Sequence, residues 1–146
     1  MAAALVLDAS VVVRWFLADE PWQEQALRLR DRIALDEASF EAPGHLPLEL
    51  AASLVRAARR GRFPATDVVP ALDALTGLGV SYLDLAAIAG DAAALALELG
   101  LSAHDAAYLV VSTRRSGSLV TADRQLYEVA AGAGYDVAWL GDLPAR

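Results

Sequence analysis

The sequence contains no cysteine and no lysine. The lack of cysteine excludes disulfides, thiolate zinc sites and thiol nucleophiles. All 12 basic residues are arginine, which excludes a P-loop lysine and a Schiff-base lysine. The chain has only two histidines, His45 and His104, so a multi-histidine metal site is excluded as well. The reactive groups present in quantity are carboxylates, with 19 Asp and Glu and a net charge of -7.

Positive charge and long apolar runs are also scarce. A net charge of -7 argues against a broad basic face for nucleic acid, but it leaves room for a local arginine patch or for phosphate contacts through a metal. No apolar run approaches the roughly 20 residues that span a bilayer. The start, "MAAALVL", has no basic residue and runs into Asp8, which is unlike a signal peptide. We expect a cytoplasmic protein with one domain over residues 1–146.

Short apolar runs alternate with stretches of helical periodicity along the chain. Strands are predicted at residues 4–7, 80–85, 118–123 and 135–140, and residues 40–45 predict a short strand or a loop. Helices are predicted at residues 9–18, 20–38, 47–61, 64–79, 86–100, 102–117 and 124–134. This alternation is typical of an α/β fold with a mainly parallel central sheet.

Four acidic residues stand where such a fold places its ligands. Asp8 and Asp123 follow predicted strands, and Asp105 and Glu49 lie in the first turns of predicted helices. Because ligands bind beyond the carboxyl ends of parallel strands, we expect the four to converge. Clustered carboxylates repel one another unless their pKa values rise or a divalent cation binds. Oxygen ligands without cysteine or histidine favour Mg²⁺ or Mn²⁺, ions that assist phosphodiester hydrolysis.

Each of these residues also has a purely structural interpretation. Asp8 and Asp123 are suited to cap the helices that follow them. Ser102 and Asp105 have the spacing of a capping box, and Glu49 is favourable at the positive end of its helix dipole. Capping explains each position separately, but it does not explain why all of them should meet at one edge.

Three stretches resemble a known family: "LVLDASVVVRW", "PLELAASLVRAARRG" and "SAHDAAYLVVSTRRSGSLVTADRQL". In this order they are similar to the signatures of PIN-domain ribonucleases and, more narrowly, of the VapC toxins of bacterial toxin–antitoxin pairs. The resemblance covers residues 4 to about 140. It implies an α/β/α sandwich with a parallel sheet and an acidic pocket at its carboxyl edge.

The resemblance also implies roles for individual residues. Asp8 and Asp105 match the positions most directly tied to metal, and Ser10 and Thr121 match hydroxyls that orient carboxylates or water. Glu41 competes with Glu49 for the glutamate position. The acidic quartet of the family corresponds to Asp8, Glu49, Asp105 and Asp123.

The family resemblance further implies a reaction and partners. Its members hydrolyse RNA phosphodiesters with Mg²⁺ or Mn²⁺ and a metal-activated water. Many form homodimers, and a VapB-type antitoxin inhibits them by inserting its tail into the pocket. The main hypothesis is therefore a metal-dependent endoribonuclease toxin.

Two rival functions would also use carboxylates of this kind. Phosphoryl transfer through an aspartyl phosphate uses a lysine that this chain lacks, and "DAS" lacks the second aspartate of a D-x-D motif. A non-catalytic acidic module that docks an arginine-bearing partner stays open, because inhibition by an antitoxin would use the same pocket.

Several other residues carry weaker expectations. Trp15, Trp22 and Leu29 are expected in core or partner packing, His104 on the surface, and Arg14 receives no role. One or two of the arginines near helix ends are expected to contact RNA phosphates, the rest being solvated. These arginines are Arg56, Arg59, Arg60, Arg62, Arg114, Arg115 and Arg124.

Overall fold

Five parallel strands form the centre of the computed structural model, which describes residues 3–145. Their order across the sheet is β3-β2-β1-β4-β5. The central strand β1 places Leu7 opposite Val120 of β4, so the residues that follow these two strands are neighbours. The strands are β1 (Ala3–Leu7), β2 (Ala38–Pro43), β3 (Ser81–Leu83), β4 (Ser118–Thr121) and β5 (Val137–Trp139).

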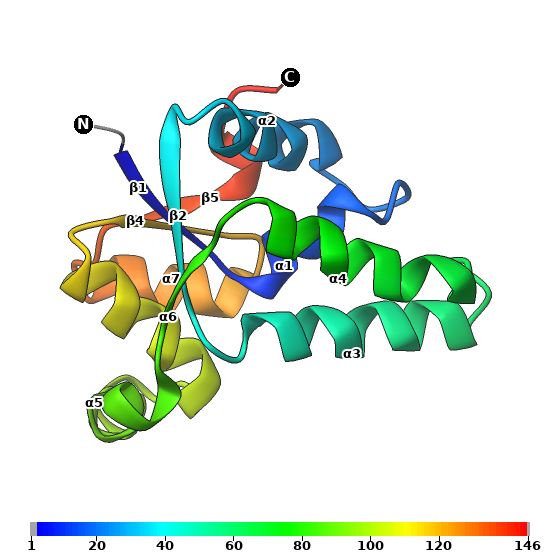
Figure 1. Ribbon diagram of the computed structural model, residues 1–146. Helices are drawn as coiled ribbons and strands as arrows, with labels where there is room; N and C mark the ends of the chain where they lie inside the picture. Colours follow the sequence, from blue (N-terminus) through cyan, green and yellow to red (C-terminus); the bar gives the residue numbers. More distant parts are fainter. Residues whose placement is uncertain (1–2, 146) are drawn as a thin grey trace.

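Helices cover both faces of the sheet. Figure 1 shows α2 above the sheet and α6 and α7 below it, while α3 and α4 run side by side as an arm that projects from it. The three-layer α/β/α sandwich with a parallel sheet is therefore confirmed. The α-helices of residues 3–145 are α1 (Ala9–Val12), α2 (Gln23–Ala34), α3 (Leu46–Arg59), α4 (Val68–Gly77), α5 (Leu85–Leu99), α6 (Ala103–Arg114) and α7 (Arg124–Gly132). Short 3₁₀ turns are η1 (Val13–Trp15), η2 (Ala65–Asp67) and η3 (Leu140–Asp142).

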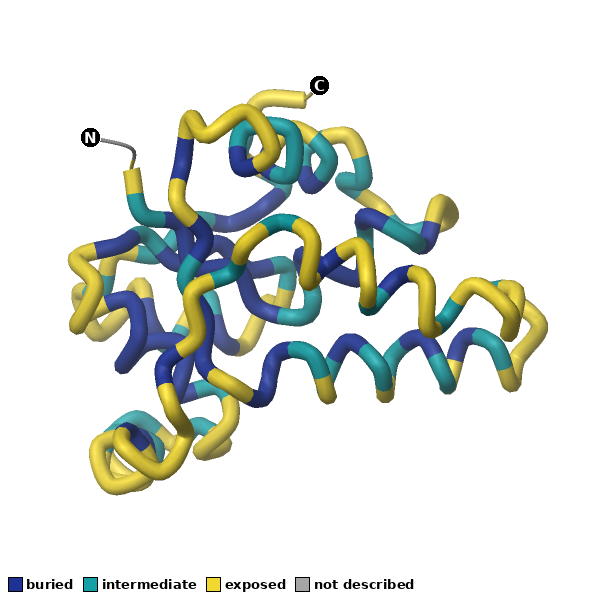
Figure 2. Tube along the Cα trace, viewed as in Figure 1, coloured by how far each residue is buried: buried dark blue, intermediate teal, exposed yellow. Residues whose placement is uncertain are grey.

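The core is built around β1 and α6. Leu5, Val6 and Leu7 are all buried, which fits a central strand covered on both faces. Residues 106–112 of α6 are buried without interruption, and Figure 2 shows the buried centre of the molecule in dark blue. A helix that is apolar all round is stable only inside a protein. Burial of α6 therefore fixes its first turn, which carries Asp105, at the edge of the sheet.

Two predicted helices are shorter in the structure. The helix predicted over residues 9–18 is a single α-turn that tightens into η1, because three consecutive valines are poor helix formers. The helix predicted over residues 20–38 spans only Gln23–Ala34, because Trp22 adopts a left-handed conformation (φ 61°) and packs against Trp139. The later residues of its apolar stripe, Ala26, Leu29 and Ile33, are buried as expected.

The segment predicted as one helix over residues 64–79 is η2 followed by α4. Pro70 is the third residue of α4, where its missing N–H removes no helical hydrogen bond. The segment that left a choice between strand and loop is strand β2, paired with β1 and β3.

No helix within residues 3–145 is by itself long and apolar enough to cross a membrane. Only α5 and α6 taken together reach that length and composition, and a bend of 111° separates them.

Candidate active site

Asp8 stands at the carboxyl end of β1 and begins α1. Its extended backbone (φ -81°, ψ 174°) ends the strand, and Oδ1 accepts a hydrogen bond from the Val11 N–H, as an N-cap does. The capping interpretation is thus correct for this residue. It is incomplete, however, because only 5% of Asp8 is exposed and its second oxygen points away from the helix toward β4.

Two hydroxyl groups hold the Asp8 carboxylate. Ser10 Oγ donates to Oδ1 at 2.5 Å, and Thr121 Oγ1 donates to Oδ2 at 2.6 Å. Each hydroxyl is itself fixed, since Ser10 accepts from the Ala122 N–H (2.9 Å) and Thr121 accepts from the Asp123 N–H (3.0 Å). This network joins the ends of β1 and β4 and locks Asp8 in one orientation.

Burial dominates the electrostatics of Asp8. It raises the pKa of this carboxyl from 3.8 to about 6, although the hydrogen bonds from Ser10, Thr121 and the Val11 N–H act in the opposite direction. The negative charge of Asp105 raises the pKa further. A carboxylate that is buried, oriented and not neutralised by an ion pair is a natural ligand for a cation.

Asp105 faces the other acidic residues from the first turn of α6. Ser102 caps this helix by accepting from the Asp105 N–H at 3.1 Å, and its side chain also acts to lower the pKa of the Asp105 carboxyl. Burial raises the pKa of Asp105, and the charges of Asp123 and Glu49 raise it further. Asp105 thus experiences repulsion from both neighbours and is the electrostatic centre of the group.

Asp123 begins α7 directly after β4. Its Oδ1 accepts from the Leu126 N–H at 3.2 Å, so the predicted capping role is observed. Asp123 is exposed. Asp123 joins the group from the strand next to that of Asp8.

Glu49 is held by two residues for which the sequence assigned no such role. Tyr108 Oη donates to Glu49 Oε1 at 2.6 Å, and His45 Nε2 lies 3.2 Å from the same oxygen, without the alignment of a hydrogen bond. Burial acts to raise the pKa of Glu49, but His45 and Tyr108 outweigh it and the pKa is lowered. Burial and the Glu49 charge raise the pKa of Tyr108, so its phenol stays protonated and remains a donor.

Two sequence signals pointed to these contacts. Tyr108 follows Asp105 by three residues and His45 precedes Glu49 by four, spacings that place side chains on one helix face.

The competing glutamate, Glu41, lies elsewhere. It is on β2, and its Oε2 is 3.8 Å from Arg115 Nε, beyond the last turn of α6. Asp105 is in the first turn of the same helix, so Glu41 and Asp105 are near opposite ends of α6. The geometry favours Glu49 as the fourth acidic residue.

A cavity of about 410 Å³ opens between α3 and α6 beside these carboxylates. Glu49 and Asp105 line it together with His104 and Arg56. His104 is exposed, as expected, but its ring also packs edge-to-face on His45, 5.2 Å between centroids. The cavity thus has an acidic wall next to two basic side chains.

Carboxylate oxygens are suitable ligands for a hard divalent cation. The charge of Asp105 interacts with those of Asp8, Glu49 and Asp123, and within residues 3–145 none of the four forms an ion pair with an arginine. No group of three or more acidic or histidine side chains in that range is arranged around a single ion position. Because two hydroxyls hold Asp8, joint binding of an ion would require the more exposed Asp105 and Asp123 to move.

Arg14 does not pair with Asp8. Its Nη1 donates to the Ser10 carbonyl (2.6 Å) and its Nε donates to the Pro21 carbonyl (2.9 Å), so it fastens the loop before α2 onto α1. Arg14 is therefore a structural residue behind the site.

An aromatic cluster lies beside the start of α7. Trp22 and Trp139 meet edge-to-face with centroids 5.0 Å apart, and the Arg124 guanidinium lies 3.9 Å from the Trp139 ring centroid. A Cβ at Gly141 would come within 2.7 Å of Trp139 Nε1 and 2.8 Å of Trp22 Nε1. Trp15 and Leu29 are core residues, as expected, whereas Trp22 is only partly buried.

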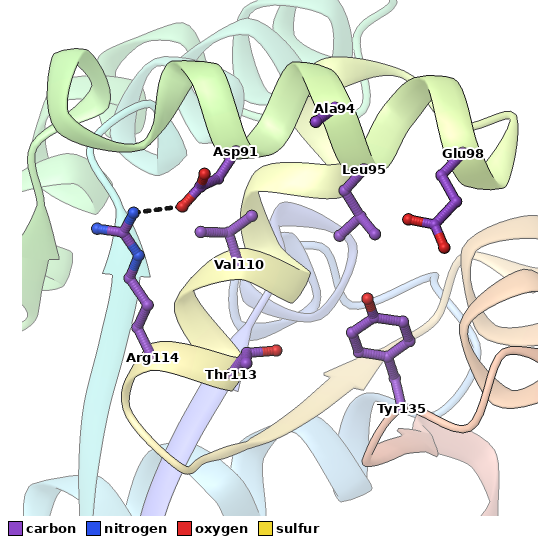
Figure 3. A pocket seen from close by; sticks show the side chains of 8 residues that line it. All are labelled: Asp91, Ala94, Leu95, Glu98, Val110, Thr113, Arg114 and Tyr135. Carbon is purple, nitrogen blue, oxygen red and sulfur yellow. Dashed lines mark hydrogen bonds and ion pairs between the residues drawn. The ribbon is translucent and has the colours of Figure 1, made fainter.

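A separate hollow of about 290 Å³ lies between α5 and the second half of α6 (Figure 3). The ion pair between Arg114 and Asp91 bridges the two helices there, and the Tyr135 hydroxyl points into the space. This hollow shares no lining residue with the acidic cavity.

The comparison with known proteins agrees with this geometry. A family model described as the PIN domain matches residues 5–132. The chain belongs to the PIN-domain family. Ribonuclease VapC3 of Pyrobaculum aerophilum is 32% identical over 130 residues, covering 85% of this chain and 92% of that protein. The resemblance to VapC-type PIN domains is therefore confirmed.

Solved structures share the fold at low sequence identity. PAE2754 from Pyrobaculum aerophilum superposes with a TM-score of 0.68 at 20% identity, covering 97% of this chain and 93% of its own. VapC20 of Mycobacterium tuberculosis, described as a toxin that cleaves the sarcin-ricin loop, superposes with a TM-score of 0.63 at 16% identity, covering 90% and 95%. In this PIN domain the matched residues 5–132 include all four carboxylates and both hydroxyls of the site.

Proposed function

We propose that this PIN domain is a metal-dependent endoribonuclease, the toxin of a VapBC-type pair. The observation that carries the proposal is the buried Asp8, held by Ser10 and Thr121 and facing Asp105 without an arginine to neutralise either charge. Such an arrangement is costly for a protein unless a cation or a proton completes it. The similarity to Ribonuclease VapC3 favours a cation over a proton.

The residues of the chain have distinct parts in this reaction. Asp8, Asp105, Asp123 and Glu49 would hold Mg²⁺ or Mn²⁺. When bound, the ion would lower the pKa of a water and stabilise charge on the phosphodiester. Ser10 and Thr121 keep Asp8 oriented, and Tyr108 keeps Glu49 ionised and turned toward the cavity. The water's proton must leave to solvent or to a carboxylate of the group.

The experiment compares RNA cleavage by the wild type, Asp8→Asn and Asp105→Asn in Mg²⁺ and in EDTA. Both variants and the EDTA sample should lose cleavage at least a hundredfold while keeping the circular dichroism of the fold. Asp84→Asn is the matched control, because Asp84 caps α5 through the Ala87 N–H but does not line the cavity. Full cleavage by both site variants would refute the proposal.

The partners follow from the same proposal. A VapB-type antitoxin would cover the acidic pocket, and the toxin would form a homodimer that cleaves RNA in the cytoplasm. The alternative is a non-catalytic module that docks an arginine-bearing partner, and it predicts no metal-dependent turnover of any RNA.

Residues 1–2 and 146 of the expected single domain lie outside the described residues.

A further inference from the structure

A second hollow adjoins the acidic cavity along α3. It has a volume of about 180 Å³, and it shares Ser53 and Arg56 with the cavity that holds Glu49 and Asp105. Arg60 and Arg62 line its far side. We call this hollow, with Arg56 and Arg60 at its rim, the basic groove.

The sequence of α3 builds this change of charge on one helix face. Glu49, Ser53 and Arg56 of α3, and Arg60 directly after its last residue, follow one another at spacings of four, three and four residues, which places them in a stripe along one side of the helix. At a rise of about 1.5 Å per residue, the stripe runs roughly 16 Å from the carboxylate to the last guanidinium. Arg59 has the same charge but lies off this stripe and lines neither hollow.

Arg56 and Arg60 carry charge that the protein leaves uncompensated. Glu20 also lines the groove, but its carboxylate is ion-paired with Arg62 (3.1 Å), which Asp19 contacts as well (3.0 Å). Arg56 instead donates to the neutral Ser53 hydroxyl at 3.2 Å. Within residues 3–145 neither Arg56 nor Arg60 takes part in an ion pair.

We propose that the basic groove binds the phosphates of a single RNA strand on one side of the scissile bond, Arg56 being nearest to the cut and Arg60 one helical turn farther. The proposal rests on the ribonuclease function proposed above and adds a binding subsite to it. A chain of net charge -7 repels RNA as a whole, and its acidic cavity repels a phosphate most strongly. The Arg56 guanidinium, which lines both hollows, and the Arg60 guanidinium, which lines only the basic groove, supply the local attraction. The groove is small, which favours one strand over a duplex.

The test measures binding without cleavage. A fluorescein-labelled single-stranded RNA of about 12 nucleotides is titrated with the full-length protein in EDTA at several KCl concentrations. Each phosphate contact on a single strand contributes about 0.7 to the slope of log K against log salt. The Arg56→Gln/Arg60→Gln double variant should lose about 1.4 from the wild-type slope, whereas Arg59→Gln should keep that slope.

Equal losses in the double variant and in Arg59→Gln would overturn the proposal, because the effect would then be one of overall charge. An unchanged slope in the double variant would also overturn it and would assign the groove to a protein partner instead. Binding in EDTA is separate from turnover in Mg²⁺. If the salt slopes of the wild type and the double variant differ as expected but the wild type never cleaves RNA, the groove proposal stands and the proposed catalysis is refuted.

Discussion

Replacing Asp8 with asparagine should stabilise the metal-free protein at neutral pH. Asparagine keeps the shape of the side chain, and the Ser10 and Thr121 hydroxyls are able to act as donor or acceptor toward it. The change removes the cost of an ionised carboxylate that is 95% shielded from solvent. The same substitution should abolish RNA cleavage, so stability and activity should change in opposite directions.

The magnitude follows from the raised pKa. The pKa of Asp8 in the folded protein is about 6, against 3.8 for an unperturbed aspartic acid side chain. Because the pKa of Asp8 is higher in the folded protein, protonation of Asp8 stabilises the fold. This stabilisation is complete below pH 3.8 and is lost as the pH rises through 6. With about 1.36 kcal/mol per pKa unit, the wild type should lose about 2 kcal/mol relative to Asp8→Asn between pH 4.5 and 7.5.

Urea denaturation in EDTA at these two pH values measures the difference. Asp73→Asn serves as the control, because Asp73 is an exposed aspartate on α4, and it should follow the wild type at both values. Millimolar Mg²⁺ should then recover the wild type at pH 7.5 but not Asp8→Asn, since a ligand that binds only the folded state stabilises it. A constant difference between wild type and Asp8→Asn across this range would refute the argument that burial without a charged partner governs Asp8.

Two further predictions concern packing and orientation. Tyr108→Phe removes the 2.6 Å hydrogen bond to Glu49, so RNA cleavage should fall about tenfold, while the free energy of unfolding should fall by only about 1–2 kcal/mol. Tyr82→Phe, at an exposed position, should leave both cleavage and stability unchanged. Full activity of Tyr108→Phe would contradict the positioning role. Gly141→Ala forces a Cβ against two indole nitrogens and should cost about 1–3 kcal/mol in urea denaturation, whereas Gly90→Ala, within α5 and with no atom near its Cβ, should stabilise the protein by up to about 1 kcal/mol.

The fold could be predicted from the sequence because its signals are local and repeated. The apolar run before Asp8 and the apolar run of residues 106–111 identify a buried strand and a buried helix without knowledge of their partners. The beginning of α2 could not be predicted. Trp22 has the correct helical spacing, but its indole packs on Trp139, more than a hundred residues away, and that contact holds its backbone in a left-handed conformation.

The acidic side of the site could be predicted for a related reason. Strand ends and first helical turns are local features, so Asp8 and Asp123 could be placed at one edge from order alone. The contact of Tyr108 with Glu49 depends on how α3 crosses α6, which the sequence does not specify, so it emerges only from the structure. His45 precedes Glu49 by four residues at the start of α3, so the local spacing could have indicated that contact.

Asp8 is contacted by two hydroxyls rather than by an arginine, so the same residue can cap α1 and would be able to bind the proposed cation. An arginine at hydrogen-bond distance would lower the pKa of Asp8 strongly and would also cancel the charge that a dication needs. Ser10 and Thr121 donate hydrogen bonds without bringing charge, so they orient the carboxylate while burial holds its pKa near 6. At neutral pH the carboxyl of Asp8 is thus mostly ionised, fixed in direction and without an arginine partner, and the divalent cation proposed above would offset the cost of burying its charge.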